Sequence, residues 1–163
     1  MLDLNELLKN ISKRLHALMG EDIEIEIVTT SDHALVEANP DHMDCTVMNL
    51  ASNSRDAMPQ GGKFILETST VELDEDSPWL SRSMKAGEYI VLSIRDNGTG
   101  MDSETRCRCF DPFFTTKDSS EGLGLTAVFS IVRSYGGDLA VHSDPGRGTT
   151  FTIYLPSAEQ HSP

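Results

Sequence analysis

Asn49 and Asn53 lie four residues apart in a segment whose apolar residues recur at helical spacing. At about 100° per residue, one arc beside the apolar stripe collects the polar side chains of His42, Thr46, Asn49, Asn53 and Asp56. Two neutral amide oxygens side by side suit a Mg²⁺ ion that already carries phosphates, because they add no further anion. A solvated polar helix face gives the same pattern, so spacing alone leaves both interpretations open.

A single acid stands in the glycine-bracketed turn D-N-G-T-G. Asp96 shares the parity of Leu92 and Ile94, so its side chain should point to the buried face of a strand. A carboxylate on an apolar wall accepts a hydrogen bond from an exocyclic amine, which adenine offers and guanine carries elsewhere on its ring. Gly98 and Gly100 would let a ligand approach bare backbone. A plain strand-ending turn is the alternative interpretation.

Glycines also open a later helix, where Gly122 and Gly124 precede a regular apolar stripe. Free N–H groups and the positive end of the helix dipole favour phosphate at such a place. The preceding segment, FDPFFTTKDSSE, has the polar and prolyl character of a lid, and its Lys117 could reach phosphates. A structural loop-to-helix join and a solvated lysine are the alternatives.

The composition of the chain limits the kinds of ligand that these residues can bind. The 163 residues suit one domain, and a net charge of -13 argues against binding a nucleic-acid backbone. No apolar run is long enough to span a bilayer and no leader pattern is present, so we expect a cytoplasmic domain without direct membrane contact. A single nucleotide remains possible, because a few backbone amides and one metal ion can hold it.

The chain reads as alternating helices and strands that would position these residues. Helices are expected over 4–19, 40–58 and 124–135, a short helix after Met101, and strands over 23–28, 34–38, 63–73, 89–96, 138–144 and 149–155. Asp3 and Asn39 are predicted helix caps, and Gly20 a helix end. The strand over 89–96 is apolar on both faces and should be central in its sheet. The order predicts an α/β sandwich with one mixed sheet and helices on one side.

Taken together, the ordered motifs resemble a known family. The segments NLASNSRDAM, DNGTGM, FDPFFTTK with GLGL, and GRGTTFTIYLP look like the N, G1, F and G2 boxes of a histidine-kinase catalytic domain, from the GHKL ATPase superfamily. The resemblance covers residues 2–156, and the F box separates sensor histidine kinases from the rest of the superfamily. It implies the Bergerat ATP-binding fold: an α+β two-layer sandwich, with a mixed sheet covered by helices on one face and an ATP lid.

The resemblance implies ATP and Mg²⁺ as cofactors. Asn53 matches the asparagine that binds Mg²⁺, and Asp96 matches the acid that binds the adenine amine. Asn49 and Asn53 are the expected catalytic pair. The further implied nucleotide-binding residues are Asp56, Gly98, Gly100, Lys117, Gly122, Leu123, Gly124 and Thr149.

Asn49 favours a kinase over an ATPase within the superfamily. Members that hydrolyse ATP carry a glutamate at this place, four residues before the metal asparagine, and an asparagine cannot replace it as a general base. The resemblance therefore implies the catalytic domain of a two-component sensor histidine kinase, which transfers the γ-phosphoryl group of ATP to a histidine on a dimerisation domain. None of the 5 histidines stands in a phosphoacceptor context.

Two differences from the family favour an alternative, a degenerate non-catalytic nucleotide-binding module. Ser120 replaces a glycine of many relatives, and Asp56 replaces a lysine. On the kinase interpretation, residues 1–156 form the domain, 1–19 join it to the dimerisation domain, and 157–163 are a tail. The expected partners are that dimerisation domain and a response regulator or receiver domain, and the isolated domain is expected to be monomeric.

Overall fold

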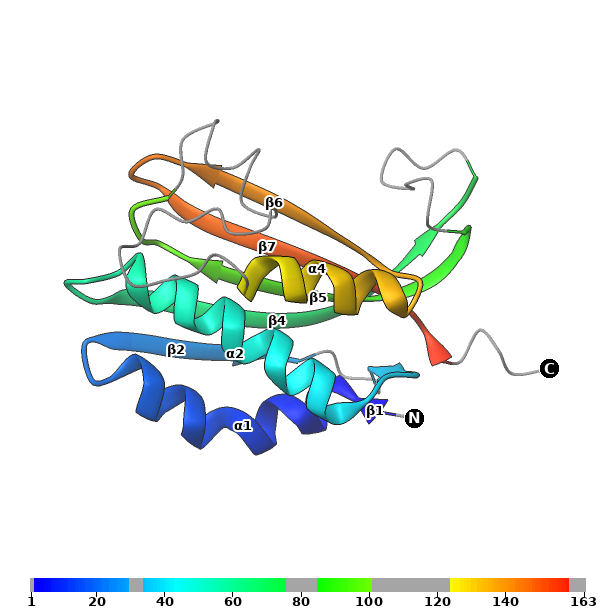
Figure 1. Cartoon of the computed structure of the whole chain (residues 1–163), viewed down its shortest axis with the longest axis horizontal. Coiled ribbons are helices and arrows are strands. Elements are labelled where there is room, and N and C mark those ends of the chain that lie inside the picture. Colours follow the sequence, from blue (N-terminus) through cyan, green and yellow to red (C-terminus); the bar gives the residue numbers. More distant parts are fainter. Residues whose placement is uncertain (1, 30–33, 76–84, 101–123, 159–163) are drawn as a thin grey trace.

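The computed structural model describes residues 2–29, 34–75, 85–100 and 124–158 (Figure 1). The elements are β1 (Leu2–Asp3), α1 (Leu4–Met19), β2 (Ile23–Val28), β3 (Leu35–Val36), α2 (Pro40–Asp56), β4 (Gly62–Leu73), β5 (Gly87–Asp96), α4 (Gly124–Ser134), β6 (Asp138–Asp144) and β7 (Gly148–Pro156). The short helix expected after Met101 lies outside the described residues. Within these ranges, no helix is long and apolar enough to span a membrane.

The first two helices begin at the capping side chains that the sequence predicts. The Asp3 carboxylate accepts the N–H of Asn5 at 3.0 Å and also that of Ala34 at 3.2 Å. The cap of α1 is therefore tied to the chain that enters β3. At the start of α2, Asn39 Oδ1 accepts the N–H of Asp41 at 2.8 Å. Both caps satisfy N–H groups that have no partner within the helix.

The end of α1 agrees with the sequence-based prediction, whereas the end of α2 does not. Gly20 ends α1 with φ +79°, as predicted, because a left-handed residue suits glycine. The prediction that α2 reaches about Met58 was too long, since the helix ends at Asp56. There the N–H of Ala57 donates to the carbonyls of Asn53 and Ser54, each at 3.1 Å, and closes the helix.

The main sheet has five strands in the order β2-β4-β5-β7-β6. β2 runs parallel to β4, and the other neighbours are antiparallel, so the sheet is mixed. The predicted central position of β5 is confirmed. The short strand β3 exists as expected, but it pairs with β1 in a separate two-stranded sheet rather than joining the main one.

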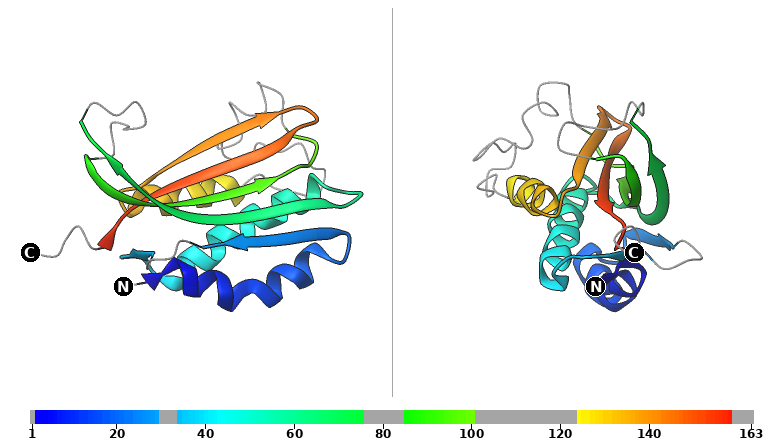
Figure 2. Two further views of the ribbon diagram at one scale, coloured as in Figure 1. Left: turned by 180° about the vertical axis from the view of Figure 1, so that it is seen from behind. Right: turned by 90° about the vertical axis from the view of Figure 1, so that its right-hand side faces the viewer.

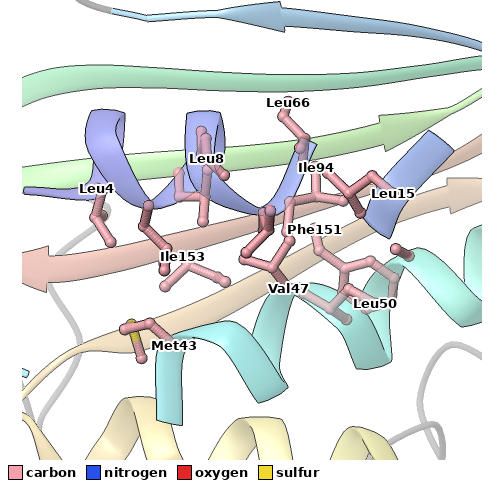
Figure 3. Close-up of a cluster of buried hydrophobic side chains, with 14 of the residues drawn as sticks. Leu4, Leu8, Leu15, Met43, Val47, Leu50, Leu66, Ile94, Phe151 and Ile153 are labelled. Atoms are coloured by element: carbon pink, nitrogen blue, oxygen red, sulfur yellow. The ribbon is translucent and has the colours of Figure 1, made fainter. Parts of the chain in front are cut away.

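The helices lie together on one side of the main sheet, as Figure 2 shows in its right-hand view, which confirms the predicted two-layer α+β sandwich. Apolar side chains from both layers meet in one core (Figure 3). Its largest fully buried members include Leu4, Leu8, Leu15, Met43, Leu50, Phe64, Leu66, Ile94 and Ile153. Burying this set is the main favourable term for the fold.

Two polar contacts fix how α1 sits against its neighbours. Thr68 Oγ1 on β4 donates to Asn5 Oδ1 on α1 at 2.7 Å, and both side chains are buried. Arg14 of α1 forms an ion pair with Asp44 of α2 near the surface. Because a buried acceptor that loses its donor is costly, the Thr68 contact should contribute more to stability than the exposed ion pair.

We therefore predict that Thr68→Val destabilises the protein by about 1–3 kcal/mol, because it removes a hydrogen bond to the buried amide oxygen of Asn5. Thr70→Val, two residues along the same strand at an exposed position, is the matched control and should change stability by less than about 0.5 kcal/mol. Urea unfolding followed by circular dichroism measures both. Equal effects of the two substitutions would contradict the assignment.

Candidate nucleotide site

The Asp96 carboxylate is the most buried charge of the described residues and lies at the end of the central strand β5. Only 4% of the residue is exposed, and its side chain points toward the helices, as its parity predicts. Oδ2 accepts the hydroxyl hydrogen of Ser54 on α2 at 2.8 Å. Oδ1 accepts the N–H of Gly98 at 2.9 Å.

Two opposing effects act on the pKa of Asp96. Burial disfavours the carboxylate and is the larger effect, so the pKa lies above its ordinary value. Hydrogen bonds from the Gly98 backbone, the Ser54 hydroxyl and the Thr149 backbone act in the other direction, because they stabilise the charged form. The result is a buried carboxylate that three donors hold in place, and a fixed acceptor of this kind suits recognition of a ligand amine.

Gly98 and Gly100 have packing reasons to be glycine. A Cβ at Gly98 would lie 2.8 Å from the carbonyl carbon of Ala57 at the end of α2, and a Cβ at Gly100 equally close to that of Asp144 in β6. Gly100 also has φ +71°. Both glycines thus let the turn fit between α2 and the β6–β7 hairpin, and their predicted contact with a base stays a prediction.

Thr149 faces the interior beside Asp96, as its parity predicts. The two residues are directly opposite in the β5–β7 ladder, and 7% of Thr149 is exposed. Its Oγ1 lies 2.8 Å from Ser143 Oγ on β6. The neighbouring Gly148 has φ +95°, and a Cβ there would lie 2.8 Å from the Cα of Asn97. Sequence reasoning missed the roles of Ser143, Gly148 and Ser54, and only the inward parity of Ser143 could have signalled one of them.

The polar face of α2 is used in part by the protein itself. Thr46 is buried, and its hydroxyl donates to the carbonyl of His42 at 2.9 Å. His42 Nδ1 lies 2.6 Å from the hydroxyl of Tyr135, just after α4. Asn49 and Asn53 are half-buried, and the Asn49 amide donates to Cys45 Sγ at 3.5 Å. The contact of Asn49 and Asn53 with a bound ligand, which their spacing predicts, stays a prediction.

Asp56 lies with Arg55 rather than with the asparagine pair. The two side chains form an ion pair at 3.3 Å, and both line a cavity of about 320 Å³ between the ends of α1 and α2. Met19, Asp22 and Met58 also line it. The sequence analysis expected Asp56 to contact nucleotide, and this stays a prediction.

The protein side chains near the asparagine pair fit a metal ion that is held mainly by the phosphates of a bound nucleotide. Among the residues that the structure describes, no group of three or more His, Cys, Asp or Glu side chains could hold a metal ion. Mg²⁺ is often bound by one or two protein oxygens together with substrate phosphates and water. One asparagine oxygen, that of Asn53, is compatible with such a site.

The phosphate side of the site is described only in part. Gly124 is the first residue of α4, an 11-residue helix, so its backbone lies at the positive end of the helix dipole. Lys117, Gly122 and Leu123, together with Ser120, lie outside the described residues.

Comparison with known proteins identifies the family. Residues 38–159 match the family described as histidine kinase-, DNA gyrase B-, and HSP90-like ATPase. The chain belongs to this family. It is 37% identical over 158 residues to the sensor kinase CckA of Brucella abortus, covering 96% of this chain and 17% of that protein. It is 32% identical to the sensor histidine kinase ZraS of Escherichia coli, covering 95% of this chain and 30% of that one.

Solved structures agree with the sequence relatives. A mycobacterial sensor histidine kinase, MprB, superposes with a TM-score of 0.76 at 26% identity, covering 95% of both chains. The catalytic domain of histidine kinase ThkA has the same fold, with a TM-score of 0.73 at 22% identity. The chain is thus homologous to the ATP-binding catalytic domain of sensor histidine kinases, and it spans less than a third of the two curated relatives described above.

Removing the Ser54 hydroxyl should raise the pKa of Asp96 further, because that hydrogen bond stabilises the carboxylate. We predict that Ser54→Ala moves the Asp96 midpoint upward in a pH titration of carboxyl ¹³C chemical shifts. Ser52→Ala, on the opposite side of α2, is the control and should leave the midpoint unchanged.

The raised pKa of Asp96 also makes the stability of the fold depend on pH. A raised folded-state pKa means that protonation of Asp96 adds stability below the pKa of the unfolded chain, and this gain is lost as pH rises through the folded value. Ser54→Ala should extend that loss to higher pH. A titration midpoint that stays in place or falls in Ser54→Ala would contradict the role assigned to the hydroxyl.

Proposed function

We propose that this domain binds Mg-ATP and transfers the γ-phosphoryl group to a histidine on a dimerisation domain. The observation that carries the proposal is the buried Asp96 carboxylate, fixed by Ser54 on the same helix that presents Asn53. Adjacent residues of α2 would thus serve the base and the metal. Family membership supports ATP as the nucleotide.

Asp96 would accept a hydrogen bond from the adenine amine, with Thr149 beside it. Gly98 and Gly100 would hold the turn against the base. Asn53 would bind Mg²⁺ and Asn49 would lie beside it, one helical turn earlier. Mg²⁺ would neutralise charge on the phosphates, while the protein groups orient the nucleotide and hold it in place.

Backbone N–H groups at the start of α4 would bind the phosphates. We propose that Gly124, the first residue of α4, supplies one such group and that Gly122, Leu123 and Lys117 are further phosphate contacts. Phosphoryl transfer needs mainly positioning and charge stabilisation, and the acceptor histidine brings its own nucleophile. Asn49 supplies no general base, so water is not activated as a competing acceptor.

The proposed setting follows from the relatives, which are named as sensor kinases. We propose that residues 1–19 join the domain to a dimerisation domain, that 157–163 are a tail, and that a response regulator or receiver domain receives the phosphoryl group. We further propose that the domain works in the cytoplasm and is monomeric in isolation.

A non-catalytic nucleotide-binding module is the second candidate. It is favoured by Asp56, which stands where many histidine kinases have lysine and pairs with Arg55. The replacement of a glycine of many relatives by Ser120 also favours this candidate. A domain of this kind would bind ATP and ADP without preference, or neither, and titration with both nucleotides distinguishes it from the kinase.

We predict that Asn53→Ala abolishes Mg²⁺-dependent ATP binding and leaves the fold intact, because a half-buried surface amide is lost while the α2 core side remains. Isothermal titration of ATP with and without Mg²⁺ measures the first effect, and circular dichroism the second. Asn10→Ala, an exposed asparagine on α1, is the matched control. If the Mg²⁺-dependent affinity for ATP is unchanged in Asn53→Ala, Asn53 does not bind the metal ion.

Transfer itself is tested with γ-labelled ATP and the dimerisation domain of the parent protein supplied in trans. We expect acid-labile label on that domain's histidine and little released phosphate, because Asn49 cannot activate water. Asn49→Glu should increase phosphate release. Brisk hydrolysis by the unaltered chain would contradict the argument from Asn49, and ATP binding without any transfer would favour the non-catalytic module.

A further inference from the structure

A buried hydroxyl pair lies behind Asp96 in the β6–β7 hairpin. Ser143 Oγ lies 2.8 Å from Thr149 Oγ1 and donates to the carbonyl oxygen of Gly148 at 3.1 Å. Only 5% of Ser143 and 7% of Thr149 are exposed. The three groups form a short chain of hydrogen bonds that ends on a backbone carbonyl.

The direction of this chain follows from what each group can do. A carbonyl oxygen only accepts a hydrogen bond, so the single hydroxyl hydrogen of Ser143 is donated to the carbonyl of Gly148. The contact between the two hydroxyls then requires Thr149 to donate to Ser143. Thr149 has no second hydroxyl hydrogen, so its oxygen offers only lone pairs to any further partner.

Thr149 stands next to the Asp96 carboxylate. The two residues are opposite each other in the β5–β7 ladder, and a backbone hydrogen bond from Thr149 reaches Asp96. A carboxylate also offers only lone pairs. At the exocyclic group of a purine, two neighbouring acceptors favour an amine, which has two hydrogens to donate, over a carbonyl, which has none.

We propose that Ser143 is a specificity-determining positioning residue, which fixes the Thr149 hydroxyl hydrogen away from the ligand and thereby selects a 6-amino over a 6-oxo purine. The inference rests on the proposed binding of a purine nucleotide at Asp96. Ser143 acts through Thr149 and does not itself touch the ligand.

Ser143→Ala removes the acceptor of the Thr149 hydroxyl, which can then rotate and donate to a ligand carbonyl. We measure the affinities of ATP and inosine triphosphate, which carries a carbonyl at position 6, by competition against a fluorescent ATP analogue. The preference for ATP should fall about fivefold to tenfold in the variant, the worth of roughly one hydrogen bond. An unchanged preference, or equal weakening of both nucleotides, overturns the proposal.

Two controls separate this role from a merely structural one. Ser143→Thr keeps the hydroxyl and should retain the preference for ATP. Ser69→Ala, on an exposed part of β4, removes a serine hydroxyl elsewhere on the sheet and should change neither affinity. If the wild-type chain binds neither nucleotide, the proposed function fails. If it binds ATP and the preference does not respond to Ser143, only this inference fails.

A measurement on the wild-type chain covers the case in which Ser143→Ala does not fold. Buried hydroxyl hydrogens exchange slowly enough to be observed by NMR at low temperature. We expect the Thr149 hydroxyl hydrogen to show nuclear Overhauser contacts to the Ser143 side chain, and the Ser143 hydroxyl hydrogen to lie near Gly148. A Ser143 hydroxyl hydrogen directed at Thr149 would overturn the proposal.

Discussion

A carboxylate removed from water must be hydrogen-bonded, and this constraint on Asp96 organises the end of the sheet where the site lies. Its donors come from three separate parts of the chain: Ser54 on α2, Gly98 in the turn after β5, and Thr149 on β7. Each donor is useful only if its element is held at the right distance. The position of α2 over the sheet is therefore coupled to the register of β5 and β7.

The same close packing requires glycine at three positions. Gly98 lies against the end of α2, Gly100 against β6, and Gly148 against the turn that follows Asp96. At each position a Cβ would approach a backbone atom within 2.8 Å, closer than real side chains come. The glycine pattern that the sequence analysis related to ligand access thus has a second cause, which is the joining of helix, turn and hairpin.

Periodicity and caps predicted much of this arrangement, because burial repeats at a fixed interval along a helix or strand. The inward direction of Asp96 and Thr149, the central position of β5 and the starts of α1 and α2 could all be inferred from local residues. The partners of Asp96 could not. In the sequence Ser54 is a small residue within the apolar stripe of its helix, and its partner lies 42 positions away, so only the packed structure brings the two together.

Ser54 and Asn53 show why one helix can serve both ends of a ligand. Successive residues on a helix point about 100° apart, so Ser54 faces the sheet while Asn53 lies on the side where His42 contacts Tyr135. A tilt of α2 would displace the Asp96 anchor and the candidate metal ligand together. In a chain with a net charge of -13, such alignment matters, because an anionic ligand must be held by a metal ion, amides and fixed geometry rather than by a basic surface.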